Sequence, residues 1–118
     1  MDYGLQHRKT HLPKDKECYG CVRVFSSFSA MLIHLEAGNC PSGTDKEMID
    51  DLAFQLYQSK KYTNDRDDYY PYHCPGCYTN VRTVSGLFQH AESVPGCQRW
   101  LKSSNCLGKL DWFIYCRV

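Results

Sequence analysis

The chain has 118 residues, a formal net charge of +1, 42% hydrophobic residues and 23% charged residues. This composition is ordinary for a soluble globular protein and allows one small domain or a few mini-domains. Because the net charge is close to zero, the chain lacks the general basic surface on which non-specific binding to nucleic acid depends. It also lacks any apolar run near the roughly 20 residues of a membrane span, so we expect no membrane partner.

The first predicted segment is a basic N-terminal arm over residues 1–17, which has no apolar stretch like that of a secretory signal peptide. We therefore expect an intracellular protein, in which the eight cysteines stay reduced and serve as metal ligands rather than as disulfides. His7 and His11 lie in this arm as spare candidate ligands.

A metal-binding frame follows over residues 18–40 and reads Cys18-x2-Cys21-x12-His34-x5-Cys40. Zinc takes four nitrogen or sulfur ligands in a tetrahedron. Two cysteines separated by two residues reach one ion only from a tight turn, and Gly20 permits the backbone to fold back there. We expect the later His and Cys to complete the shell from the end of a helix.

Apolar positions inside this frame predict a small core. Phe25 follows the second cysteine by four positions, and Met31 precedes His34 by three, which places Met31 and His34 on one face of the helix. A core of this size is too small to fold alone, and zinc binding worth ~10–16 kcal/mol would supply the folding free energy.

The linker over residues 41–73 begins with one predicted amphipathic helix at about residues 45–60. Thr44 and Glu47 have the spacing of a capping box at its start. Six apolar residues form one helical stripe: Met48, Ile49, Leu52, Ala53, Leu56 and Tyr57. Such a stripe either packs against the nearest metal-binding unit or binds a partner, and we favour packing in so small a protein.

The rest of the linker, "YTNDRDDYYPYH", is acidic and rich in tyrosine. Residues 41–72 carry four Lys or Arg against seven Asp or Glu, a balance of −3. We favour a solvated loop here over an acidic docking segment. Tyr72 is expected to enter the first strand of the next unit.

The metal-binding frame recurs over residues 74–97 as Cys74-x2-Cys77-x12-His90-x6-Cys97, with Gly76, Val81 and Leu87 in the places of Gly20, Phe25 and Met31. A single Cys-x2-Cys also suits a buried or redox-active pair, but two matched copies favour metal. We predict two zinc ions held by eight ligands: Cys18, Cys21, His34, Cys40, Cys74, Cys77, His90 and Cys97. Four protein ligands per ion are typical of structural zinc, whereas a catalytic zinc keeps one position open.

The C-terminal segment over residues 98–118 is basic and aromatic, with four Lys or Arg against one Asp, a balance of +3. Its last part, "LDWFIYCRV", is compatible with a strand or a short helix. We expect its large residues, Trp112 to Tyr115, to be buried against a metal-binding unit or the linker helix. If they are exposed beside the cations, they would instead suit single-stranded nucleic acid, whose bases stack on aromatic rings.

The repeated frame, Cys-x2-Cys-x3-apolar-x5-apolar-x2-His, resembles the ββα zinc finger of the transcription-factor type, in the variant whose last His is replaced by Cys. The phrases "LIHLEAGNC" and "LFQHAESVPGC" are also similar to small fungal zinc-finger proteins. The resemblance implies a small zinc-stabilised α+β fold, with two ββα fingers at 18–40 and 74–97 joined by the linker helix. Tyr72 stands where the family places an aromatic residue before the first Cys, and Lys16 departs from that pattern.

Several potential ligands remain outside the two frames. The pair His7-x3-His11 resembles the tail of a preceding finger, or else belongs to a flexible arm. A third zinc shared by His7, His11, Cys106 and Cys116 is conceivable but not favoured, because no local spacing supports it. His73 adjoins Cys74 and is expected to point away from its metal.

DNA-reading fingers contact bases from helix positions −1, 3 and 6. Counting from the helix His as position 7, these are Ser27, Ala30 and Ile33 in one unit and Thr83, Gly86 and Gln89 in the other. Only Gln89 is a strong base reader. Residues 41–73 also separate the fingers by more than the short linker with which tandem fingers follow one groove.

We therefore expect a binding module rather than an enzyme: a zinc protein that contacts another protein, in the nucleus and in transcriptional regulation. One alternative is a DNA-binding transcription factor, and another is single-stranded nucleic acid binding through residues 98–118. Catalysis has no support in the sequence, which has neither a Gly-rich phosphate loop nor the zinc deaminase pattern.

Overall fold

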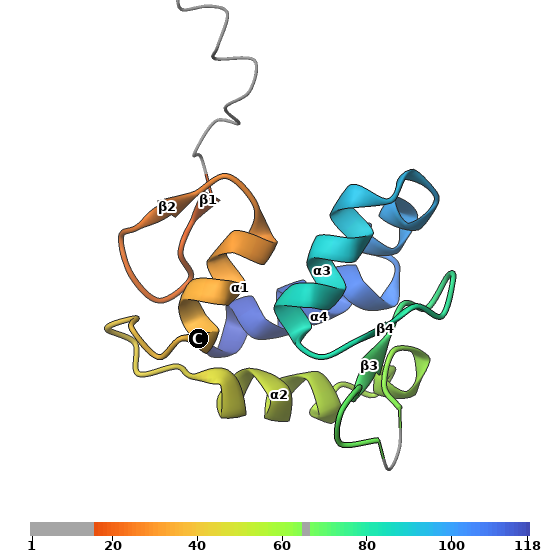
Figure 1. Cartoon of the computed structure of the whole chain (residues 1–118). Helices are drawn as coiled ribbons and strands as arrows, with labels where there is room; N and C mark the ends of the chain where they lie inside the picture. Colours follow the sequence, from red (N-terminus) through yellow and green to blue (C-terminus); the bar gives the residue numbers. More distant parts are fainter. Residues whose placement is uncertain (1–15, 65–66) are drawn as a thin grey trace, which may run out of the picture.

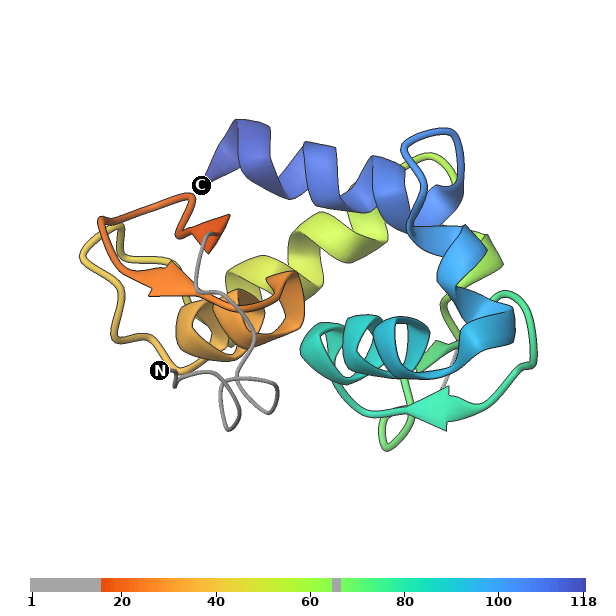
Figure 2. The ribbon, with the colours of Figure 1, turned by 90° about the horizontal axis from the view of Figure 1, so that it is seen from above.

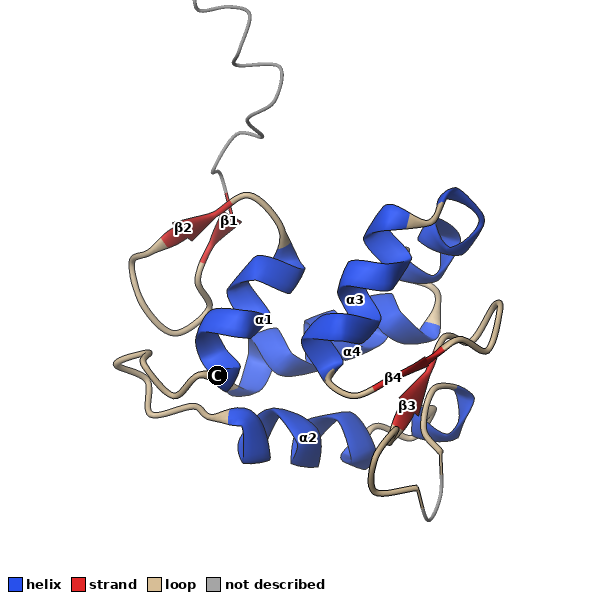
Figure 3. Cartoon of the chain, viewed as in Figure 1, coloured by secondary structure: helices blue, strands red, loops and turns tan. Residues whose placement is uncertain are grey.

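A computed structural model describes residues 16–64 and 67–118 and shows a small α+β protein (Figures 1 and 3). The predicted fold class is confirmed at this level. The first part contains β1 (Lys16–Glu17), β2 (Val24–Phe25), α1 (Phe28–Glu36) and α2 (Lys46–Gln55). The second contains η2 (Ser59–Lys61), β3 (Tyr72–His73), β4 (Asn80–Val81), α3 (Val84–Ser93), η3 (Pro95–Leu101) and α4 (Cys106–Arg117).

The strand pair and helix of residues 16–36 recur in the same register at residues 72–93. We call residues 18–40 the first repeat and residues 74–97 the second repeat. Strand β1 pairs antiparallel with β2 through Lys16 and Phe25, and β3 pairs with β4 through Tyr72 and Val81. Equivalent residues are 56 positions apart, as His34 and His90 are. The duplication in the sequence therefore extends to the backbone.

The helices of the two repeats begin with the same kind of cap. Ser27 accepts a hydrogen bond from the backbone N–H of Ala30, and Thr83 accepts one from that of Gly86. These hydroxyls satisfy amide donors that have no partner within the helix. Ser27 and Thr83 occupy position −1 in the numbering of DNA-reading helices. Because they accept these hydrogen bonds, both side chains cap their own helices.

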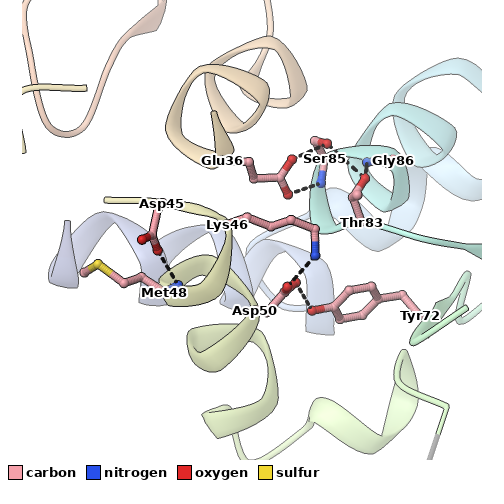
Figure 4. A network of polar contacts seen from close by, with 9 residues as sticks. All are labelled: Glu36, Asp45, Lys46, Met48, Asp50, Tyr72, Thr83, Ser85 and Gly86. Atoms are coloured by element: carbon pink, nitrogen blue, oxygen red, sulfur yellow. Dashed lines mark hydrogen bonds and ion pairs between the residues drawn. The ribbon is translucent and has the colours of Figure 1, made fainter. Parts of the chain in front are cut away.

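Helices α1 and α3 lie side by side and antiparallel, and reciprocal caps join their ends (Figures 1 and 2). The Glu92 carboxylate accepts hydrogen bonds from the backbone N–H and the hydroxyl of Ser29, at 3.1 and 2.6 Å. Glu36 accepts the same pair from Ser85, at 3.1 and 2.6 Å (Figure 4). A carboxylate at a helix N-terminus is favoured by the free amides and by the helix dipole, so each helix stabilises the start of the other.

Between these caps the interface is apolar. The rings of Phe28 and Phe88 meet edge to face with centroids 4.8 Å apart, and both side chains are buried. Leu32 and Ala91 are fully buried in the same cluster. The pair of repeats therefore packs as an internal two-fold arrangement.

The linker helix α2 is shorter than predicted. Its N-cap is Asp45, whose carboxylate accepts from the backbone N–H of Met48, rather than Thr44. It ends at Gln55 because Leu56 turns to an extended backbone, so the prediction of a helix reaching residue 60 was wrong.

Packing of α2 involves part of the predicted stripe. Ile49, Ala53 and Leu56 are buried, whereas Met48 and Tyr57 are 44% and 78% exposed. The helix packs against α1, α3 and α4. The Asp50 carboxylate also accepts from the Tyr72 hydroxyl at 2.5 Å and so ties α2 to strand β3 (Figure 4).

The C-terminal segment forms the helix α4, which runs from the second repeat towards the first (Figure 2). Leu107, Leu110 and Ile114 recur at helical spacing and are buried. Trp112 and Tyr115 fall on the other face, where they are 66% and 51% exposed, so the prediction that they are buried was wrong.

One hydrophobic cluster joins all these elements. It contains buried side chains of both repeats, of α2 and of α4, including Met31, Leu87 and Leu110. Phe25 and Val81 are half-buried against it. None of the helices within the described ranges is long and apolar enough to cross a membrane.

Candidate metal centres

The first repeat brings four potential ligands together. Cys18 and Cys21 lie in the turn between β1 and β2, His34 on the last turn of α1, and Cys40 in the loop beyond it. The four ligand atoms lie within 4.8 Å of one another. The Sγ atoms of Cys18 and Cys40 are 3.9 Å apart, and Sγ of Cys21 is 3.5 Å from Nε2 of His34.

The second repeat builds the same cluster from Cys74, Cys77, His90 and Cys97, again within 4.8 Å. The Sγ atoms of Cys74 and Cys97 are 3.5 Å apart, and Sγ of Cys77 is 3.2 Å from Nε2 of His90. In each repeat the turn between the strands supplies two thiols, and the helix with its following segment supplies the imidazole and the third thiol.

Both clusters have the size and chemistry of a tetrahedral zinc site. With Zn–S bonds of ~2.3 Å and Zn–N bonds of ~2.0 Å, the edges of the tetrahedron are ~3.8 Å between sulfurs and ~3.5 Å between sulfur and nitrogen. The four separations given above, 3.2 to 3.9 Å, lie around these values, and all ligand atoms of a cluster lie within 4.8 Å of one another. Three thiols and one imidazole are soft and borderline donors, which suit zinc rather than calcium or magnesium.

Hydrogen bonds from outside the clusters reach the sulfurs. The backbone N–H groups of Gly20 and Gly76 point to the Sγ atoms of Cys18 and Cys74, each at 3.4 Å. The hydroxyl of Ser42 donates to Cys40 at 3.2 Å, and that of Thr79 lies 3.1 Å from the Cys77 sulfur. Such contacts hold thiolates in place and offset part of their charge.

The two turn glycines are needed for space rather than for a left-handed backbone. Neither Gly20 nor Gly76 has a positive φ, in contrast to Gly38 and Gly43. A Cβ on Gly20 would lie 2.6 Å from Cβ of Ser42, and one on Gly76 would lie 2.4 Å from Nε1 of Trp100. Glycine is therefore required at both positions, but for a different reason than the backbone freedom expected from the sequence. The crowding neighbours lie 22 and 24 residues further along the chain.

The thiols of each cluster differ in acidity. Burial raises the pKa of Cys18 to about 11, and burial with the neighbouring thiols of Cys74 and Cys77 raises that of Cys97 to about 12. The hydrogen bonds from Thr79 lower the pKa of Cys77 to about 6. For Cys40, burial raises the pKa, but the hydrogen bonds from Ser42 outweigh it and bring the value to about 6.

These opposite shifts have a simple consequence. Burial favours the protonated thiol at Cys18 and Cys97, whereas hydrogen bonds favour the thiolate at Cys40 and Cys77. Metal binding requires the deprotonated thiolate, so a dication must displace the proton from Cys18 and Cys97.

The remaining candidates lie outside both clusters or outside the described residues. His7 and His11 belong to the residues that the structure does not describe. His73 lies 2.8 Å through Nδ1 from the Asn64 amide oxygen and is not a member of its neighbour's cluster. Cys106 is buried and Cys116 exposed on α4, and neither joins a metal-binding group among the residues described.

Sequence reasoning missed the residues that support the clusters: Ser42, Thr79 and Trp100. It also missed the reciprocal caps, although a signal was present. Ser29 and Glu36 recur as Ser85 and Glu92 at equivalent positions, and the zinc frame itself requires neither. No family model, curated protein or solved structure matches this chain.

Proposed function

We propose that the chain is a zinc-binding protein in which two Cys-Cys-His-Cys fingers of the ββα type, at residues 18–40 and 74–97, are joined by the helix α2 and serve as a scaffold for binding another protein. Each ion would be held by three thiolates and one imidazole, a formal charge of −1 per site. All four positions are filled by protein ligands, which supports a structural rather than a catalytic ion.

The pairing of α1 with α3 carries this proposal. A finger that reads DNA presents the N-terminal half of its helix to the bases. Here Phe28 and Ser29 of α1, and Val84 and Ser85 of α3, are buried in or beside the helix pair. Ser29 and Ser85 also bind the glutamates of the opposite helix. The start of each helix is thus partly covered by the other repeat, whereas positions −1, 3 and 6 stay half-buried or exposed.

The positions that remain give little base-reading chemistry. Ser27 and Thr83 cap their own helices, and Ala30 and Gly86 have no polar side-chain atoms. Gln89 is the exposed side chain at these positions that could pair with adenine. We therefore favour a protein partner over duplex DNA. The proposal includes an intracellular, nuclear location, since free thiolates need a reducing compartment and the finger frame resembles transcription-factor fingers.

Two measurements test the structural role of zinc. Native mass spectrometry is expected to find two zinc ions per chain, and complete chelation is expected to abolish the helical circular dichroism and the thermal transition. A chain that keeps its spectrum and melting temperature without metal would contradict the proposal.

A random duplex library separates a protein-binding module from a DNA reader. We expect no enriched motif, and no loss of duplex affinity on Gln89→Ala beyond what a control such as Gln55→Ala shows. Nanomolar selection of one motif that depends on Gln89 would establish the DNA-binding alternative instead.

A further inference from the structure

A groove crosses the exposed face of α4. Two cavities of about 370 and 330 Å³ lie on either side of Trp112 and share Ser103 and Gly108 as lining residues. Trp112 stands between them with 66% of its surface exposed. We call this surface the Trp112 groove, and its main lining residues are Tyr57, Ser103, Gly108, Lys109, Trp112 and Tyr115. Figure 2 shows α4 along one edge of the molecule, with α2 on its inner side.

The inner walls of the cavity on the Lys109 side are apolar. Leu56 and Phe113 contribute to its walls, and Tyr57, 78% exposed, forms part of its rim. A volume of about 330 Å³ is in the range of small ligand pockets and exceeds what a single large apolar side chain needs. Exposed aromatic residues beside such a cavity are typical of the central anchors of protein interfaces.

Positive charge lies on one side of the groove. Nζ of Lys109 lies 3.2 Å from the Tyr57 hydroxyl and 5.8 Å from the centre of its ring, so the ammonium is held at the rim. Lys102 adjoins the lining residue Ser103 and is exposed. The one acidic residue of 98–118 is Asp111, which lines the cavity on the other side of Trp112 and whose carboxylate accepts a hydrogen bond from the Tyr19 hydroxyl at 2.5 Å. An acidic ligand would therefore complement the Lys109 side of this surface.

We infer that the Trp112 groove binds a short acidic peptide segment of a partner protein, with an apolar side chain beside Trp112 and carboxylates near Lys109. This inference rests on the proposed function, because it names the surface and the class of partner of the protein-binding scaffold. An apolar anchor would gain affinity by burial, and the carboxylates would speed association and give specificity.

The shape of the groove favours a peptide over single-stranded nucleic acid. A base buried in the cavity would need hydrogen-bond partners for its edges. The polar side chains lining it are Tyr57, Ser103, Lys109 and Trp112, and of these Tyr57 and Lys109 already contact each other. Tyr115 is packed edge-on against Tyr19, with centroids 4.9 Å apart, and tilted against Trp112 at 5.2 Å. Its ring is therefore less available for stacking than a base-binding platform requires.

Selection from a displayed library of random peptides on the zinc-loaded full chain tests the inference. We expect enriched peptides to carry a large apolar residue flanked by Asp or Glu, with affinity that falls as salt is raised. Trp112→Ala should weaken the best peptide at least about tenfold. Lys109→Glu should weaken it too, and should restore binding to a peptide whose acidic residues are replaced by Lys.

Ile33→Ala is the matched control, because Ile33 is 52% exposed on α1 and lies outside the groove lining. It should leave peptide affinity unchanged, and all variants should retain two zinc ions and the parent circular dichroism. If peptides bind but their affinity depends on Ile33 and not on Trp112, the inference fails while the protein-binding function stands.

A pool of random single-stranded oligonucleotides provides the second arm. Binding of this pool that is lost in Trp112→Ala, without enrichment of any peptide, would overturn the inference in favour of nucleic acid. Failure of both libraries would also overturn it. Enrichment of a duplex DNA motif alone would remove both the inference and the proposed function.

Discussion

The two repeats bring four potential ligands together by different routes after the helix. In the first, α1 ends at Glu36 and the chain turns through Gly38, whose φ is +79°, to place Cys40. In the second, Val94 is extended and Pro95 starts the short helix η3, which carries Cys97. The spacing from the helix His to the fourth ligand is one residue longer in the second repeat, because α3 has 10 residues and α1 has 9. The position of the fourth ligand is thus shared, whereas the path to it is not.

The surroundings of the clusters differ as well. The first turn is covered by Ser42, in an exposed loop, and the second by Trp100, whose ring is half-buried. Cys21 is half-buried in the first cluster, while its equivalent Cys77 is exposed. The ligand frame therefore tolerates different covers, and the two sites need not respond alike to substitution.

Loss of one ligand should have the largest effect and should show whether the repeats fold as one unit. We expect Cys74→Ser to abolish zinc binding by the second repeat. It should unfold the first repeat as well, because a single hydrophobic cluster spans both repeats. Zinc worth ~10–16 kcal/mol exceeds the stability of a domain this small. Circular dichroism and zinc stoichiometry measure the outcome.

The control for this loss is Cys116→Ser, an exposed cysteine outside both clusters, which should change neither measurement. A Cys74→Ser chain that retains one zinc and the spectrum of a folded first repeat would show that the repeats are independent.

Substitution of the turn glycines should have a smaller effect on stability, and this effect should differ between the two repeats. Gly76→Ala would push a Cβ into the half-buried Trp100 ring, and we expect it to lower the free energy of unfolding by about 3 kcal/mol. Gly20→Ala meets Ser42 in an exposed loop that can shift, so a loss of about 1 kcal/mol is expected. Chemical denaturation of the zinc-loaded protein measures both.

Gly96→Ala is a matched control, because a Cβ there meets nothing within 4 Å. Combining Gly76→Ala with Trp100→Leu should recover part of the loss by freeing space. Equal losses of unfolding free energy in Gly20→Ala and Gly76→Ala would show that Ser42 and Trp100 do not make the two turns differ.

The reciprocal caps test the symmetric part of the molecule. Glu36→Ala and Glu92→Ala each remove an acceptor of two hydrogen bonds at the start of the opposite helix. We expect equal losses of about 1–2 kcal/mol in denaturation experiments. Asp51→Ala, an exposed acid on α2, should cost much less. A large effect at one glutamate only would show that the helix pair is not equivalent at its two ends.

The ligand sets could be found from sequence because each lies within about two dozen residues at spacings that a tetrahedral ion dictates. The α1–α3 pair could not, because it depends on contacts such as Ser29 with Glu92 across 63 residues. The C-terminal segment was ambiguous for another reason. A run such as Trp112 to Tyr115 reads equally as strand or helix, and only the helix sends Ile114 inward while Trp112 and Tyr115 face outward.

Hydrogen bonds to the thiols should give a smaller difference between the repeats than the turn glycines do. Ser42→Ala removes a donor to Cys40 and also the contact of the same hydroxyl with the Thr44 hydroxyl at 2.9 Å. Thr79→Val removes only the contact with Cys77 and keeps the shape of the side chain. We therefore expect the free energy of zinc binding to weaken by about 1.5 kcal/mol in Ser42→Ala and by about 0.5 kcal/mol in Thr79→Val. Competition with a chelator, monitored as zinc release from each variant, measures the two effects. A larger effect in Thr79→Val would show that the exposed Cys77 depends more on its neighbouring hydroxyl than Cys40 does.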